Sequence, residues 1–168
     1  NLKWLTIRLW ALGAKRFAIS GRERLKREFV MCRTLREAGF PVPRIFHVNL
    51  RENALLEEFI EGANLGNLMK EFLFAETKSR EVLTFLARTG DLVARVHAAG
   101  FTIGDCKPEN VIVGPDGRPN LVDLEQAARG GDRAWDIAEF LFYSGHYVPS
   151  VASAEPFEHM ARAFIGGY

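Results

Sequence analysis

The predicted fold depends mainly on residues 96–125, which read VHAAGFTIGDCKPENVIVGPDGRPNLVDLE. Residues 111–113 (V-I-V) are apolar and β-branched, and residues 120–123 (N-L-V-D) form a second short strand-like run. Between them, residues 114–117 (G-P-D-G) are typical turn residues. This pattern predicts a β-hairpin, in which the end of the second strand lies beside the start of the first.

Polar side chains border this hairpin at the ends that meet. Asn110 directly precedes the first strand, Asp123 closes the second, and Asp105 lies on the preceding loop. We therefore expect Asp123 to lie close to Asn110, with Asp105 nearby. Carboxylate and amide oxygens suit Mg²⁺, which prefers hard oxygen ligands and usually shares them with substrate phosphates. Asp105 is then free to accept a proton from an attacking hydroxyl, as a general base does.

The loop G-D-C-K-P-E-N at residues 104–110, followed by D-L-E at residues 123–125, resembles the catalytic loop and metal motif of the protein-kinase-like superfamily. An ordinary loop with a hydrogen-bonded Asp and Asn is the alternative interpretation. The match in both spacing and identity favours the kinase-like one. The resemblance implies ATP and Mg²⁺ as cofactors and assigns these site residues: catalytic Asp105 and Lys107, and metal-binding Asn110 and Asp123.

The same resemblance assigns nucleotide-binding residues upstream. Glu28 matches the acidic residue of the kinase αC helix, whose partner is a lysine on a strand. Neither Lys3 nor Lys15 lies in a convincing strand of that kind, and no glycine-rich loop is found. The run E-F-I-E-G that starts at Glu58 looks like the hinge between kinase lobes, where the backbone of Glu58 and Ile60 pairs with adenine.

The fold class that follows is α+β, a bilobal protein-kinase-like fold. We expect a partial, β-rich N-lobe over residues 1–61, with the αC-like helix and the hinge, and a mainly helical C-lobe over residues 62–168. Hydrophobic periodicity predicts the strands and helices. The expected strands cover residues 44–48 and 54–60, and the expected helices cover residues 21–39, 64–74, 80–99 and 157–165, with another that starts at Asp132. We interpret the basic face of the first helix as a solvated surface.

The sequence differs from regulated protein kinases at two places, and these differences indicate which branch of the superfamily it resembles. Ile103 and Gly104 stand where those kinases have His-Arg, and the chain after Asp123 lacks a long activation segment. Both features resemble the atypical branch, which includes Bud32-like and RIO-like kinases. The runs R-E-A-G-F-P-V-P-R-I and E-E-F-I-E-G look most like the Bud32-like group. By the same resemblance, Asp136 is the helix Asp that braces the catalytic loop.

The predicted function is ATP-dependent phosphoryl transfer by a Bud32-like serine/threonine protein kinase, which Lys107 favours. A small-molecule kinase, for a sugar or an aminoglycoside-like acceptor, is an alternative that Gly104 favours. A third interpretation is an ATP-binding or weakly hydrolytic subunit of a tRNA-modifying assembly. It is favoured by Leu124 and Glu125, which stand where kinases have Phe-Gly. The expected partners are ATP, a protein or small-molecule hydroxyl acceptor, and other subunits.

The amino-acid composition bears on nucleic-acid binding, on the cellular setting and on membrane insertion. With 22 Lys and Arg against 21 Asp and Glu, the chain has no overall basic field that favours direct nucleic-acid binding. Cys32 and Cys106 lie far apart without metal-ligand spacing, which predicts a reduced, cytoplasmic setting. No apolar run has the length of a membrane span. The chain starts at Asn1 and stops directly after a helical pattern, so we expect a fragment of a longer protein.

Overall fold

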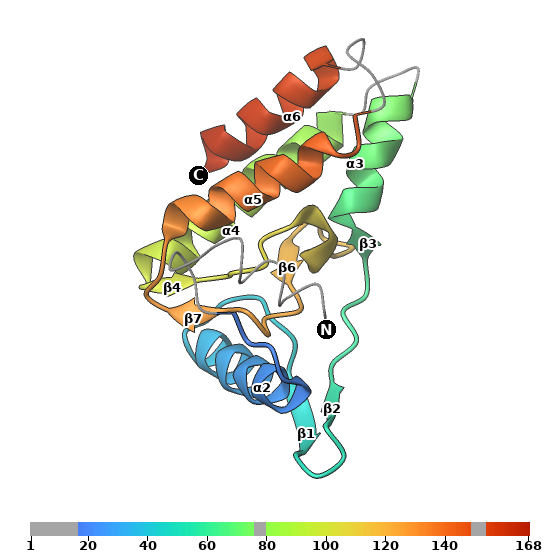
Figure 1. Cartoon of the computed structure of the whole chain (residues 1–168). Helices are drawn as coiled ribbons and strands as arrows, with labels where there is room; N and C mark the ends of the chain where they lie inside the picture. Colours follow the sequence, from blue (N-terminus) through green and yellow to red (C-terminus); the bar gives the residue numbers. More distant parts are fainter. Residues whose placement is uncertain (1–16, 76–79, 149–153) are drawn as a thin grey trace.

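The structure is a computed structural model that describes residues 17–75, 80–148 and 154–168. Lys3 and Lys15 lie outside these residues. In Figure 1, helix α2 and strands β1 and β2 lie at one end of the molecule, and helices α3 to α6 lie at the other. Among the described residues, no helix combines the length and the apolarity that crossing a membrane requires.

Helix α2 (Gly21–Glu37) and the hairpin of β1 (Ile45–Asn49) and β2 (Ala54–Glu57) form the smaller part. The Ser20 side chain caps the start of α2, and Gly39 follows its end with a φ of 84°, a backbone conformation that glycine adopts without strain. The expected helix and hairpin are therefore confirmed. Strand β2 ends earlier than predicted, because the chain leaves the hairpin after Glu57.

The predicted hairpin around the catalytic loop forms as β5 (Val111–Val113) and β6 (Pro119–Leu121), which pair antiparallel. Strand β3 (Ala63–Asn64) pairs with the other edge of β5, so the order of the sheet is β3-β5-β6. A short 3₁₀ helix, η1 (Pro108–Asn110), leads into β5. Strand β6 is shifted towards the turn relative to the prediction, because Asp123 takes a left-handed φ of 57° that ends the strand.

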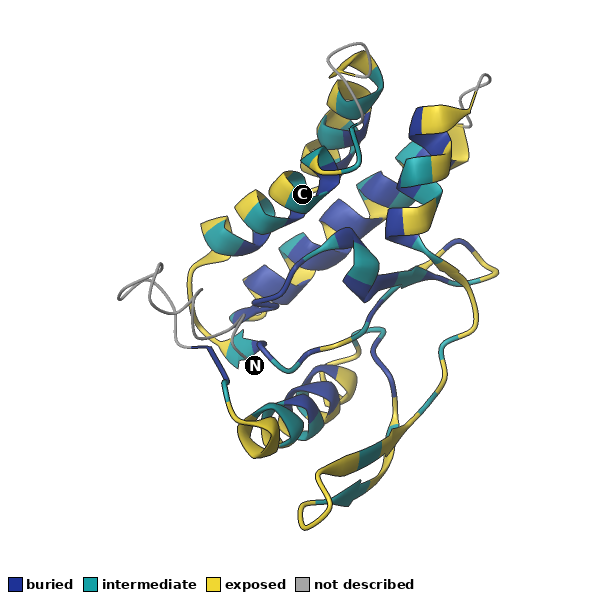
Figure 2. Cartoon of the chain, turned by 45° about the vertical axis from the view of Figure 1, so that its right-hand side comes forward, coloured by how far each residue is buried: buried dark blue, intermediate teal, exposed yellow. Residues whose placement is uncertain are grey.

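The larger part is helical, and α4 (Arg80–Ala98) lies at its centre with α6 (Ala154–Gly167) packed along it. Helix α3 (Leu65–Phe74) and helix α5 (Arg133–Gly145) also pack against α6. Figure 2 shows the buried face of α4 enclosed by these elements. Buried apolar side chains form one core that runs from α2 through α4 to α6. Strands β4 (Phe101–Thr102) and β7 (Ala128–Arg129) pair at the end of α4 that leads into the catalytic loop.

The contact between α4 and α6 depends on a glycine. A Cβ atom at Gly90 would collide with the Phe164 carbonyl oxygen and lie 2.8 Å from the Tyr168 amide nitrogen. We expect Gly90→Ala to lower the free energy of unfolding by about 1–3 kcal/mol, because the helices must separate. Urea denaturation measures this loss. The control is Gly21→Ala, where no atom of the described part of the chain lies within 4 Å of the added Cβ. An equal loss in both variants would contradict the prediction.

Candidate active site

The β5–β6 hairpin brings the expected metal ligands together. Val111 pairs with Leu121, and the Val122 amide donates a hydrogen bond to the Asn110 carbonyl oxygen at 3.0 Å. Asp123 therefore follows directly after a residue that is bonded to Asn110. The spatial proximity that the hairpin pattern predicts is present in the structure.

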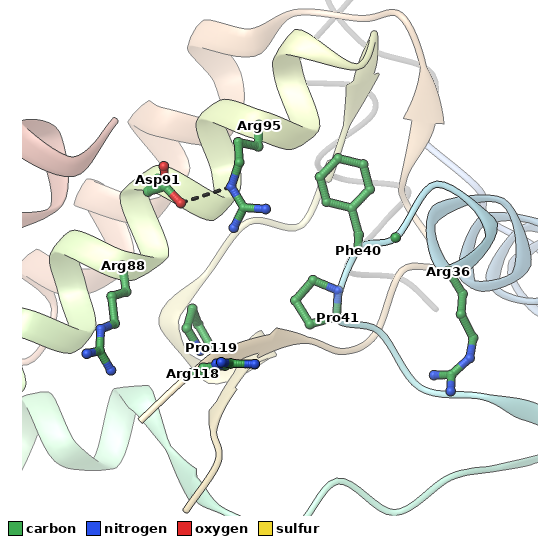
Figure 3. Close-up of a pocket in the computed structure, with 9 residues that line it drawn as sticks. Arg36, Phe40, Pro41, Arg88, Asp91, Arg95, Arg118 and Pro119 are labelled. Carbon is green, nitrogen blue, oxygen red and sulfur yellow. Dashed lines mark hydrogen bonds and ion pairs between the residues drawn. The ribbon is translucent and has the colours of Figure 1, made fainter. Parts of the chain in front are cut away.

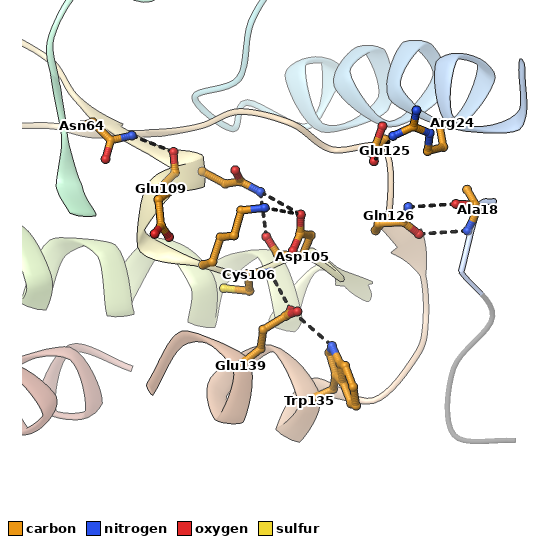
Figure 4. Close-up of polar contacts among 12 residues, drawn as sticks. Ala18, Arg24, Asn64, Asp105, Cys106, Glu109, Glu125, Gln126, Trp135 and Glu139 are labelled. Atoms are coloured by element: carbon orange, nitrogen blue, oxygen red, sulfur yellow. Dashed lines mark hydrogen bonds and ion pairs between the residues drawn. The ribbon is translucent and has the colours of Figure 1, made fainter. Parts of the chain in front are cut away.

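Asp105 lies at the centre of the site and is 1% exposed (Figure 4). Its Oδ2 atom lies 2.7 Å from the Lys107 ammonium and 3.3 Å from the Asn110 side-chain nitrogen, which also donates to the Asp105 carbonyl oxygen at 2.9 Å. Among the described residues, its Oδ1 atom is buried and has no hydrogen-bond partner. Leaving a buried carboxylate oxygen unpaired costs free energy, so such an atom is a candidate for a ligand contact.

The donor set around Asp105 fits a hard divalent cation. Because the Asn110 side-chain nitrogen donates to Asp105, its amide oxygen is the group left for a metal. Asp123 offers a second oxygen donor. Burial, followed by the negative charges of Glu125 and Asp105, raises the pKa of Asp123 to about 6. Crowded negative charge of this kind is relieved when a cation binds.

Lys107 lies on the same loop and is mostly buried, with a side chain that is 17% exposed. Burial acts to lower the pKa of its ammonium. The hydrogen bond to Asp105 and the charges of Asp105 and Asp123 outweigh burial, so the pKa of Lys107 is raised overall. The ammonium therefore stays charged at neutral pH and can face an anionic group beside Asp105.

Asp136 holds the backbone of the catalytic loop in place. Its carboxylate is fully buried and accepts hydrogen bonds from the Ile103 amide at 2.6 Å and the Gly104 amide at 2.7 Å. His97 adds a contact at 2.9 Å through Nε2, while its Nδ1 lies 2.9 Å from the Tyr168 hydroxyl. The expected bracing role of Asp136 is present, and His97 extends the brace from α4 to the end of α6.

Comparisons with known proteins place this geometry in a family. Residues 18–140 match the RIO domain. The chain belongs to the RIO domain family. This membership confirms the predicted atypical, Bud32-like and RIO-like branch of the protein-kinase-like superfamily.

Individual relatives agree with this placement. The KEOPS complex subunit Bud32 of Pyrococcus abyssi (strain GE5 / Orsay) is 28% identical over 103 residues, which cover 61% of this chain and 44% of that protein. The structure of the bifunctional kinase-methyltransferase WbdD matches with a TM-score of 0.58 at 19% identity, over 88% of this chain and 35% of that chain. Monomeric WbdD matches with a TM-score of 0.57 at 20% identity, over 86% and 37%.

These likenesses confirm the predicted α+β, bilobal protein-kinase-like fold of this RIO domain. The chain spans less than half the length of the relatives it matches. The division of the lobes between residues 61 and 62 stays a prediction.

Several residues outside the predicted motifs support the catalytic loop of this RIO domain. Glu139 Oε2 accepts hydrogen bonds from the Cys106 amide at 2.9 Å and from the Trp135 indole at 3.2 Å (Figure 4). Glu139 lies on α5 three residues after Asp136, so both carboxylates face the same loop. That spacing from the bracing Asp was the signal in the sequence that could have identified Glu139.

Two further contacts tie the segment after Asp123 to the first turn of α2 and to the residues before it. Arg24 Nη1 pairs with Glu125 Oε1 at 3.0 Å. The Gln126 side chain accepts from the Ala18 amide at 2.9 Å and donates to the Ala18 carbonyl at 3.1 Å (Figure 4). Each contact joins residues about a hundred positions apart, so no local pattern in the sequence indicates it.

Glu28 lies on the buried face of α2 and is 9% exposed. Its Oε1 accepts from the Cys32 thiol at 3.2 Å, while Oε2 has no partner among the described residues. Burial raises the pKa of Glu28 to about 7, and the nearby charge of Asp123 adds to this effect. Helix α2 thus carries its acidic residue towards the metal motif, as an αC-like helix should.

This raised pKa predicts a pH-dependent stability. The folded state holds the Glu28 proton more tightly than the unfolded chain, so the protonated form stabilises the fold below about pH 4.5 and this stability is lost as the pH rises through about 7. We expect Glu28→Gln to raise the free energy of unfolding at pH 8 by about 2–3 kcal/mol and to have little effect at low pH. Glu37→Gln, on an exposed turn of the same helix, is the control. A Glu28→Gln variant that is less stable than the wild type at pH 8 would contradict this.

The predicted hinge residues are held by the first hairpin. Glu58 and Ile60 follow β2 on the connection to β3. The Glu58 amide donates to the Arg44 carbonyl at 2.8 Å, and the Glu58 carboxylate accepts from the Arg44 amide at 3.0 Å. Because its amide is already bonded, Glu58 has its backbone carbonyl left for contact with a base.

Proposed function

We propose that this chain is the core of an ATP-dependent phosphotransferase of the Bud32-like serine/threonine kinase type. The observation that carries the proposal is the Oδ1 atom of Asp105, which is buried beside the Lys107 ammonium and has no hydrogen-bond partner within residues 17–75, 80–148 and 154–168. A general base needs a lone pair that faces the substrate and a position fixed by its neighbours. Lys107 and Asn110 fix Oδ2, which leaves Oδ1 to accept the proton of an acceptor hydroxyl.

The other predicted site residues have roles around this base. Asn110 and Asp123 would hold Mg²⁺, which supplies charge neutralisation on the phosphates of ATP when it is bound. Lys107 places its ammonium where the migrating phosphoryl group carries negative charge. In the hinge, the Glu58 carbonyl and the Ile60 amide would contact adenine. Glu28 would orient a lysine on the phosphates, consistent with its burial on the face of α2 near Asp123.

Two other functions remain candidates for the same site. A small-molecule kinase would use the same base with a different acceptor, and Gly104 beside Asp105 favours it. An ATP-binding subunit with weak hydrolysis is favoured by the relative named as a KEOPS complex subunit, which also supports the proposal of partner subunits. The buried thiols of Cys32 and Cys106 suit a reduced, cytoplasmic setting for each of these functions.

Radiolabelled ATP distinguishes these functions. We expect Mg²⁺-dependent transfer of label to protein; label on a metabolite indicates the small-molecule kinase, and slow ADP release without an acceptor indicates the weak ATPase. Asp123→Asn should abolish the Mg²⁺-dependent signal in every case, because it removes a charged metal ligand. Wild-type protein that neither binds nor consumes MgATP would refute phosphotransfer as the function.

A further inference from the structure

A cavity of about 660 Å³ lies away from the proposed catalytic residues, none of which lines it. It is open to solvent, and three parts of the fold line it: the end of α2, one face of α4 and the turn before β6 (Figure 3). Four of its lining residues are arginines and one is a carboxylate: Arg36, Arg88, Arg95, Arg118 and Asp91. Phe40 and Pro41 add apolar lining. The cavity is therefore strongly basic in a chain whose overall net charge is +1.

The arginines are held in place but only partly neutralised. Arg88 donates to the Gly117 carbonyl at 2.8 Å, and Arg36 donates to the Val42 carbonyl at 3.0 Å. A carbonyl orients a guanidinium without cancelling its charge. Each guanidinium carries five N–H donors, so most of these donors remain available to a ligand. The Arg36 guanidinium also lies 3.4 Å from the Glu58 carboxylate, which is longer than its hydrogen bond to Val42. The Arg36 side chain is 49% exposed.

The remaining arginines have weak surface ion pairs. Arg95 pairs with Asp91 at 2.9 Å one turn away on α4, and Arg118 pairs with Asp116 at 3.4 Å within the turn. All four of these side chains are more than half exposed, where ion pairs contribute at most about 1 kcal/mol. An anionic ligand can therefore compete for both arginines at little cost.

The spacing of the arginines indicates the kind of ligand. Arg88 and Arg95 are seven residues apart on α4, which places them two helical turns, or about 10 Å, apart along the axis. Arginine side chains are long, so from these two positions the guanidiniums can converge on neighbouring anionic groups of one molecule. Phosphate is the favoured group, because it carries more charge than a carboxylate and accepts paired hydrogen bonds from guanidinium.

We propose that this cavity is a second ligand site, which binds a small molecule with more than one phosphate group. Its volume lies in the range of small-molecule pockets, about 300–1,000 Å³. The nearly balanced charge of the whole chain does not favour a polymer such as RNA, which needs an extended basic surface. The proposal does not depend on the catalytic function of Asp105.

The test is calorimetric titration of the full chain with inorganic pyrophosphate at low salt. EDTA removes Mg²⁺ and so suppresses binding at the proposed catalytic site. We expect saturable binding that weakens about tenfold in Arg95→Gln and in Arg118→Gln, since each loses a charge-assisted contact. Arg118 is 81% exposed, so that variant should fold normally. Arg162→Gln removes an exposed, ion-paired arginine on α6 and is expected to bind as the wild type does.

The outcomes distinguish the proposal from other sources of affinity. No saturable binding to the wild type, or equal weakening in Arg162→Gln, would overturn it. If a short single-stranded RNA binds more tightly than pyrophosphate and through the same arginines, the ligand is a polymer and the proposed small molecule is wrong. Titration with a nucleoside diphosphate and a sugar bisphosphate then identifies the source of the phosphates. Asp105→Asn should leave all these affinities unchanged. A failure of the catalytic proposal can therefore be distinguished from a failure of the second-site proposal.

Discussion

Replacement of Asp105 by asparagine is expected to lower the turnover of phosphoryl transfer about 10²–10⁴-fold, the usual contribution of a general base. Asparagine matches the shape of the carboxylate but cannot accept the proton of the attacking hydroxyl. Nucleotide affinity should change little, because Asn110 and Asp123 remain. Initial rates of transfer from radiolabelled ATP, together with a separate titration of ATP, measure the two effects independently.

Asp132→Asn is the matched control for this change. Asp132 caps the start of α5, and its side chain accepts from the Ala134 amide at 2.9 Å. Asparagine caps a helix about as well as aspartate does, so this variant should keep wild-type turnover. An Asp105→Asn enzyme that turns over at the wild-type rate would show that the base is another group, and the assigned chemistry would be wrong.

Asp136→Asn is expected to lower the free energy of unfolding by about 3 kcal/mol, the largest effect on stability that we predict. Its Oδ2 atom accepts from the Ile103 amide and contacts His97, while Oδ1 accepts from the Gly104 amide. Asparagine has only one acceptor oxygen. Its side-chain NH₂ group would therefore face a buried N–H donor that the second carboxylate oxygen of Asp136 accepts from in the wild type. Turnover should fall as well, because the catalytic loop loses its anchor.

Urea denaturation measures this loss, and Asp91→Asn supplies the comparison. Asp91 lies on α4 with a side chain that is 60% exposed, and its pair with Arg95 is a surface contact. Its replacement should cost no more than about 0.5 kcal/mol. If both variants denature at the same urea concentration, the Asp136 brace does not carry the stability that its buried contacts imply.

Local sequence patterns determined the elements on which the site is built. The alternation of apolar runs with a G-P-D-G turn predicted the β5–β6 hairpin, and its register brings Asn110 next to the residue before Asp123. Helix α2 and the start of α5 at Asp132 also follow from short-range signals. These features could be predicted because the residues that form them lie within a few positions of one another in the sequence, where spacing alone determines the geometry.

Tertiary structure decided what surrounds these elements. The basic face of α2 was interpreted as a solvated surface, yet Arg24 pairs with Glu125 and Arg36 lines the basic cavity. The raised pKa of Glu28 likewise results from burial against distant segments. Contacts of this kind join residues far apart in the chain, and their energy depends on burial and on neighbouring charge. The sequence alone therefore determined the catalytic motif, whereas only the packing of α2, α4 and the hairpin created the electrostatic surroundings of the site and the second cavity.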